Sequence, residues 1–300
     1  MVSVPPAHER ATVRSAPLPA AVIVVLAILV LGATCYGLLA PGAYRTVPEL
    51  LRQTWRAEDA VSLASIPLIV IAWWRARAGS IRAYVVTTGM LMWLAYAYAH
   101  LAFAVPFSPV FPLYVAILGT AGYGALDGLV RADVSAVQAA FARAPRRVAA
   151  WFLMVSSVAI AGLWLSDIAV GVFGGTPANL HLSSLPNPTW VIDLAWVVPM
   201  AFAAGVRLRR GRAAGLLLGG AMLVMLTALS LSMLGVVPFA LIAGLGSDST
   251  VAPQLVAFTG IFTVLGSLEV GLLAVSVRRA LPAPTPRTTS VWWMPRDRTF

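Results

Sequence analysis

The sequence contains no lysine, because all 21 of its basic residues are arginines. Without a lysine amine the chain cannot form a Schiff base, which excludes a retinal-type chromophore. Cys35 is the only cysteine, so an intrachain disulfide and a thiolate metal cluster are excluded as well. Charged residues make up only 11% of the 300 residues, and hydrophobic residues make up 60%. A soluble domain could not cover its surface with so few charges, so we expect lipid to surround most of the chain.

Sequence motifs of the common catalytic sites are also missing. The chain has no Gly-x-x-x-x-Gly-Lys-Ser/Thr loop, no His-Glu-x-x-His and no Gly-x-Ser-x-Gly. No segment between the hydrophobic stretches is long enough for a nucleotide-binding or catalytic domain. Any catalysis would therefore have to use residues at membrane depth. We expect no cofactor and no bound metal.

Hydrophobic stretches of about 17–24 residues, each long enough to cross a bilayer, occur eight times. We predict membrane spans at 19–40, 58–74, 83–104, 111–130, 148–170, 190–206, 213–236 and 254–277. Eighteen of the 21 arginines lie in the two tails and in alternate connections between these spans. Basic residues are retained in the cytoplasm during insertion, so both termini are expected there. The predicted fold class is all-α, a polytopic transmembrane helical bundle of eight spans.

The net charge of +10 follows from this topology and from contact with anionic lipid headgroups, rather than from nucleic-acid binding. The sequence is rich in Ala, Val, Gly, Pro and Arg, which is typical of a GC-rich bacterial genome. We therefore expect a multi-pass protein of a bacterial inner (plasma) membrane. Its expected partner is the lipid bilayer with its anionic headgroups, and a homo-oligomer or hetero-oligomer is left open.

Residues 1–17 and 280–300 are rich in Pro, Arg, Ser and Thr and are predicted to be disordered cytoplasmic tails. Between them, residues 18–279 are predicted to form a single transmembrane domain. Apolar residues at helical spacing predict surface helices at 131–147 on the inner leaflet and at 44–57 on the outer side. Six tryptophans fall near the predicted span ends, which is typical of an interfacial aromatic belt without chemistry: Trp55, Trp73, Trp74, Trp151, Trp164 and Trp190.

The two halves of this domain, 18–130 and 148–279, show a similar order of residues. The interval from proline to the first arginine is eight residues in both the second and the sixth span: Pro67 to Arg75 and Pro199 to Arg207. Because four crossings separate the matched elements, both halves would have the same orientation. We therefore predict a parallel 4+4 repeat with a central groove between the halves.

Glu269 is the acid for which a structural role is hardest to find. It lies nine residues before Arg278, roughly 13 Å along the eighth span. A carboxylate at that depth is costly unless it is protonated, paired or hydrated, so we regard Glu269 as a candidate proton-coupling group. A protonated Glu269 that only hydrogen-bonds a neighbouring helix is the structural alternative. Asp127 is its counterpart in the fourth span, where water or Arg131 could satisfy it.

A second group of candidates lies toward the outer side and could converge on a vestibule: Asp59, His100, Asp167 and Asp193, with His181 in a loop. The structural alternative for Asp59 and Asp193 is capping, because both are predicted to fall in the first turn of a helix. Asn187-Pro188-Thr189 is a helix start in its own right.

His100 ends an aromatic stripe on the third span, with Trp93, Tyr96 and Phe103 at intervals of three or four residues. Packing of these rings around one hydrogen-bonded histidine explains the stripe without a ligand. A haem would need a second histidine inside the bilayer. A zinc site that joins His100 to outer aspartates has suitable ligand types but no supporting spacing.

The run Tyr96-x-Tyr98-x-His100-x-x-Phe103, followed by Phe111-Pro112-Leu113-Tyr114, resembles a segment of an uncharacterised group of bacterial integral membrane proteins with about eight spans. The Thr189-Trp190-x-x-Asp193-Leu194 start of the sixth span is similar to the same group. The resemblance covers about a fifth of the chain. It implies a topology and no activity.

Transport is the leading functional hypothesis: a small solute or ion would pass between the halves, with Glu269 and Asp127 as protonatable coupling groups. A non-catalytic scaffold, assembly factor or sensor subunit of a complex is the alternative. A third hypothesis is an intramembrane enzyme that acts on a lipid or exported substrate through the outer candidates. Nothing in the sequence identifies a catalytic residue.

Overall fold

The computed structural model describes residues 18–175, 177 and 187–279, and in this part of the chain the regular structure is entirely helical. Eight helices are long and apolar enough to cross a membrane, which confirms the prediction of a multi-pass helical membrane protein. They are α1 (Ala20–Leu39), α2 (Glu49–Arg77), α3 (Ile81–Ala104), α4 (Phe111–Val130), α6 (Arg146–Val172), the continuous α7–η2–α8 helix (Pro188–Arg209), α9 (Ala213–Ile242) and α10 (Ala252–Arg279).

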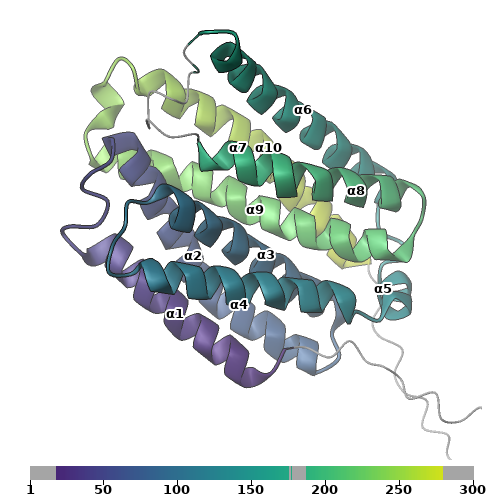
Figure 1. Ribbon diagram of the computed structural model, residues 1–300. Helices are drawn as coiled ribbons and strands as arrows, with labels where there is room; N and C mark the ends of the chain where they lie inside the picture. Colours follow the sequence, from purple (N-terminus) through teal and green to yellow (C-terminus); the bar gives the residue numbers. More distant parts are fainter. Residues whose placement is uncertain (1–17, 176, 178–186, 280–300) are drawn as a thin grey trace, which may run out of the picture.

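Helices α3 and α9 lie at the centre of the bundle (Figure 1). In α3, 78% of the most apolar window is buried, whereas in α10 only 17% is buried. α3 packs against α2, α4 and α9, and α9 packs against α2, α8 and α10. Gly89 permits the close approach of the two central helices, because a Cβ there would lie 2.6 Å from the carbonyl oxygen of Ala221.

Consecutive spans run antiparallel, so alternate connections meet at the same end of the bundle (Figure 1). We call one end the arginine-rich end, because it carries Arg75, Arg77, Arg82, Arg131, Arg146, Arg147, Arg207, Arg209, Arg210, Arg212 and Arg278. Two tight turns at this end have the same form. Gly79 after α2 and Gly211 after α8 have φ of 92° and 69°, a conformation that glycine adopts without steric cost.

The prediction of a separate surface helix at 44–57 is wrong. Residues 49–57 are instead the first part of α2, which begins after Pro48 and runs without interruption to Arg77. This segment is amphipathic because it packs on protein: Trp55 is only 3% exposed, and Leu50 and Ala57 are also buried. The predicted span at 58–74 is therefore too short at its N-terminal end.

The segment 131–147, where a surface helix was predicted, does contain a helix, α5 (Val134–Ala140), and Asp133 caps its first turn. The apolar side chains of Val137 and Phe141 are buried, and α5 packs against α9 and α3. It therefore covers the arginine-rich end of the bundle rather than lying apart on the leaflet.

Candidate functional site

Two neighbouring carboxylates of α2 are buried near the end opposite the arginine-rich end. Glu58 is 1% exposed and Asp59 is fully buried. Glu58 precedes Arg75 by 17 residues, which places it about 25 Å along the helix from that arginine. Adjacent residues of an α-helix point about 100° apart, so the two carboxylates face different neighbours. Each belongs to a separate polar centre.

The first centre, which we call the Glu58–His100 centre, consists of Glu58, His100 and Thr189. Nδ1 of His100 lies 3.1 Å from Oε1 of Glu58, and its Nε2 lies 2.8 Å from the hydroxyl oxygen of Thr189. The imidazole is thus fixed at both nitrogens, between α2 and the start of the sixth span. Tyr96 packs on the same imidazole, with ring centroids 4.9 Å apart.

Asp193 lies beside this centre in η2 (Asp193–Val197), a π-helical turn between α7 (Pro188–Ile192) and α8 (Val198–Arg209). Pro199 has no N–H to donate to the carbonyl of the residue four positions earlier, and a wider turn just before it accommodates this defect. The indole N–H of Trp164 on α6 donates to Oδ2 of Asp193 at 2.7 Å. Tyr96 and His100 both lie within electrostatic reach of the same carboxylate.

The second centre, which we call the Asp59 centre, consists of Asp59, Tyr44, Tyr98 and Tyr114. The hydroxyl of Tyr44 donates to Oδ2 of Asp59 at 2.8 Å and lies 3.4 Å from the hydroxyl oxygen of Tyr114. Tyr98 packs on Tyr114 with ring centroids 5.9 Å apart, within electrostatic reach of Asp59. All four residues are buried.

Several buried polar atoms of this region have no hydrogen-bond partner among the described residues. The described part of the chain contains ten such side-chain atoms, and eight of them belong to the helices that form this region, α2, α3, α7 and η2. They include one oxygen of each of the three buried carboxylates, Glu58, Asp59 and Asp193. Buried polar groups in proteins are nearly always bonded, so a concentration of incomplete ones marks a place for water, an ion or a ligand.

The prediction that Asp59 and Asp193 cap helix starts is wrong. Asp59 lies ten residues after Glu49, the first residue of α2, and Asp193 lies within a continuous helix that begins at Pro188. Asn187 does cap that helix, because its side-chain oxygen accepts the N–H of Thr189 at 3.0 Å.

The structure brings His100 and Asp193 together and places Asp59 in the adjacent centre. Asp167 is half-buried on α6, and His181 lies outside the described residues. The stripe of Trp93, Tyr96 and His100 packs ring on ring, as predicted, whereas Phe103 is exposed.

Sequence reasoning missed the partners of these residues. Glu58 is not among the candidates that the sequence pattern indicates, although it contacts His100 directly. Trp55 and Trp190 are 3% and 8% exposed, so they belong to the bundle interior and not to the interfacial belt. Trp164 carries a hydrogen bond to Asp193. Two adjacent acids within a long amphipathic helix were the available signal for this site.

The two remaining candidate acids, Glu269 and Asp127, are paired in the structure. The hydroxyl of Ser230 on α9 donates to Oε2 of Glu269 at 2.8 Å, and Glu269 is 3% exposed. Asp127 forms an ion pair with Arg131 one turn later on α4. Gly266 allows α10 to approach Ser230 closely. A Cβ added to Gly266 would lie 3.3 Å from the Cβ of Ser230.

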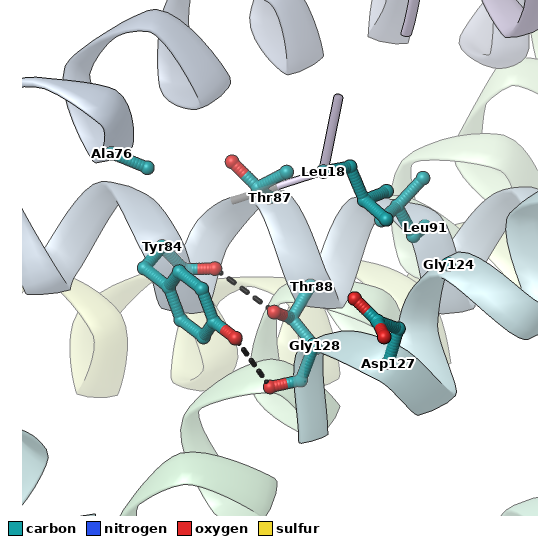
Figure 2. Close-up of a pocket in the computed structure, with 9 residues that line it drawn as sticks. All are labelled: Leu18, Ala76, Tyr84, Thr87, Thr88, Leu91, Gly124, Asp127 and Gly128. Atoms are coloured by element: carbon teal, nitrogen blue, oxygen red, sulfur yellow. Dashed lines mark hydrogen bonds between the residues drawn. The ribbon is translucent and has the colours of Figure 1, made fainter. Parts of the chain in front are cut away.

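A small cavity lies beside Asp127 near the arginine-rich end (Figure 2). Thr87, Thr88 and Tyr84 of α3 line it opposite Asp127, and the hydroxyl of Tyr84 donates to the Gly128 carbonyl at 2.7 Å. It leaves about 10 Å³ for the centre of a water molecule. That volume is close to the minimum for a single buried water and excludes a larger solute.

Among the described residues, no group of three or more His, Cys, Asp or Glu side chains is arranged to hold a metal ion. The zinc hypothesis therefore has no structural support. No family model, no curated protein and no solved structure matches this chain. Its function must be inferred from its own geometry.

Proposed function

We propose that this multi-pass membrane protein is a proton-coupled secondary transporter whose two four-helix halves move against each other. The observation that carries the proposal is the Glu58–His100 centre: a buried carboxylate and a buried histidine of the first half, of which the histidine also contacts Thr189 of the second half. Ionisable groups at such depth are expensive and usually functional. The composition supports a bacterial inner membrane as its location.

The pattern of helix packing supports a 4+4 repeat. In the first half α1 packs on α2, α2 on α3 and α3 on α4; in the second half α6 packs on α8, α8 on α9 and α9 on α10. The central helices α3 and α9 are each the third span of their half and pack on each other, although α9 also packs on α2 without a comparable contact between α3 and α8. Pro67 and Pro199 interrupt the helical hydrogen bonding of the corresponding spans, where bending is least costly.

His100 connects the halves at one point. It belongs to the first half, where it contacts Glu58, and its other ring nitrogen contacts Thr189 of the second half, so a relative movement of the halves must break the contact with Thr189. Protonation of Glu58 removes the negative charge that faces the imidazole and turns an acceptor oxygen into a donor. Arrival of a proton therefore loosens the hold of Glu58 on the imidazole, and so weakens the contact that the other ring nitrogen makes with Thr189 of the second half. This is the coupling that a transporter requires.

Glu269 and Asp127 retain a place in this proposal as further proton-coupling groups. Glu269 lies between α9 and α10 with one hydroxyl partner, and Asp127 borders the small cavity near the arginine-rich end. Contacts of arginine with tryptophan at that end, Arg77 over Trp73 and Arg209 over Trp151, support an orientation toward anionic headgroups.

The test measures charge movement in proteoliposomes on a solid-supported membrane, without knowledge of a substrate. A jump from about pH 8 to about pH 5 crosses the usual titration range of histidine and is expected to give a transient current. Glu58→Gln and His100→Asn should abolish most of it. Glu49→Gln is the matched control, because Glu49 lies on the same helix in a partly exposed ion pair with Arg52.

Transients of equal size in wild type, Glu58→Gln and His100→Asn would refute the proposal and favour a scaffold or assembly subunit. Once the transients are assigned, solutes are screened for collapse of an imposed pH gradient. A gradient that no solute collapses, in liposomes that still show the Glu58-dependent transient, would limit the protein to proton sensing.

A further inference from the structure

The Asp59 centre shares no residue with the Glu58–His100 centre and has a different composition. We propose that it binds a sodium ion, held by the carboxylate of Asp59 and the hydroxyl oxygens of Tyr44, Tyr98 and Tyr114. The site lies within the first half of the bundle, so the inference stands independently of the transport proposal.

The ligand atoms favour a hard monovalent cation. All of them are oxygens, which are the ligands of hard cations, and neither nitrogen nor sulfur is among them. The centre contains one carboxylate, so one positive charge neutralises it. Glu58 is the nearest other acid and is engaged with His100.

Two of these oxygens are buried without a partner. Oδ1 of Asp59 and the hydroxyl of Tyr98 have no hydrogen-bond partner among the described residues, and both side chains are fully buried. Arg56 lies within electrostatic reach of Asp59, but the described residues contain no ion pair to this carboxylate. A bare, unpaired carboxylate in this place would be costly, and a bound cation removes the cost.

The spacing of the hydroxyl oxygens suits an ion of this size. Oxygen ligands lie about 2.3–2.6 Å from Ca²⁺, whose ionic radius is close to that of Na⁺. Two oxygens at right angles around such an ion are therefore about 3.4 Å apart. The hydroxyl oxygens of Tyr44 and Tyr114 are separated by 3.4 Å.

The backbone is arranged to deliver Tyr44 to this centre. Tyr44 has φ of 59°, and it is the only non-glycine residue with positive φ in the described part of the chain. Arg52 holds that conformation by donating from Nε to the Tyr44 carbonyl at 3.1 Å. Gly37 of α1 leaves space for this centre, because a Cβ there would overlap the Asp59 carboxylate.

The experiment follows thermal unfolding of the full-length protein in detergent at fixed pH and ionic strength, with choline chloride replaced stepwise by NaCl. The melting temperature is expected to rise with NaCl and to saturate, because an ion that binds only the folded state stabilises it. KCl should have a much smaller effect. Asp59→Asn is expected to lose the response, and Glu49→Gln, on the same helix, should keep it.

Tyr98→Phe decides the question even if Asp59→Asn does not fold. If Tyr98 is a ligand, the Phe variant needs a several-fold higher NaCl concentration for half of the temperature shift. If the site holds no ion, removal of an unpaired buried hydroxyl should leave the protein as stable or more stable, with no dependence on NaCl. Equal responses to NaCl, KCl and choline chloride, or a full response in Asp59→Asn, would overturn the proposal. The pH-jump currents are to be recorded in choline chloride without sodium, so that failure of the sodium site and failure of the transport proposal are distinguished.

Discussion

Gly37→Ala tests the packing of the Asp59 centre without removing any polar atom. A Cβ on Gly37 would overlap Oδ2 of Asp59 and lie 2.7 Å from the hydroxyl oxygen of Tyr44, so one of these side chains must move. Overpacking of this kind costs about 1–3 kcal/mol. Alanine is favoured over glycine in a helix by about 1 kcal/mol, which offsets part of that cost. The free energy of unfolding should therefore fall by about 0–2 kcal/mol.

The matched control is Gly32→Ala on the same helix. A Cβ at Gly32 would lie 3.6 Å from Cδ1 of Leu113, an ordinary contact, so this variant should gain about 1 kcal/mol of stability. The difference between the two variants, about 1–3 kcal/mol, isolates the clash. Titration with a denaturing detergent, followed by circular dichroism, measures both.

The same two glycine substitutions, made in an Asp59→Ala protein, test whether the Asp59 carboxylate is the group that clashes. In Asp59→Ala the carboxylate is gone, and the two glycine substitutions should then differ much less than in the wild-type background. Equal effects of Gly37→Ala and Gly32→Ala in the wild type would show that Asp59 and Tyr44 do not occupy the space beside Gly37. That result would remove the geometric basis of the sodium site.

Glu269→Gln should be at least as stable as wild type, because the amide oxygen still accepts the hydroxyl of Ser230 and no carboxylate is buried; a clear loss of stability in the same detergent titration would show that the carboxylate itself is needed. Trp164→Phe removes the donor to Asp193 and should lower the free energy of unfolding by about 1–3 kcal/mol, so an unchanged value would argue against that bond. Asp248 lies in an exposed loop, and three hydrogen bonds to its carboxylate lower its pKa. A lowered pKa in the folded state stabilises the turn before α10 above the usual carboxyl range, and this stability is lost as the pH falls through the folded pKa. Asp248→Ala should therefore speed hydrogen exchange at the backbone N–H groups of Thr250 and Val251, which donate to the carboxylate. Asp248→Asn keeps an acceptor oxygen and should not.

The eight spans could be predicted from the sequence because hydropathy and arginine placement report directly on the solvent of each segment. The start of α2 could not be predicted in this way. Its first nine residues, 49–57, include two arginines and an acid, so they read as a polar surface segment. Their burial depends on tertiary packing of side chains such as Trp55, which a local pattern does not contain. Placing the helix start at 58 then led directly to the wrong capping role for Asp59.

The residue types of the candidate site were visible in the sequence, but their partners were not. Glu58 and His100 are 42 positions apart, and His100 and Thr189 are 89 positions apart. No periodicity within one helix relates residues at such separations. Only the packing of α2, α3 and α7 defines which acid meets the histidine.

Depth along a helix does not say whether a carboxylate has all its hydrogen-bond partners. The number of unpartnered carboxylate oxygens separates structural acids from candidate binding acids better than depth does. Glu269 is deep but has a hydroxyl partner on α9, and Asp127 is paired with Arg131. Glu58 and Asp59 lie nearer one end of the bundle, yet each keeps a buried oxygen with no partner among the described residues. An acid that the fold already satisfies can be structural, whereas one left incomplete is the better candidate for binding a proton, a water or a cation. The adjacent pair on α2 is therefore where a proton or a cation should first be sought.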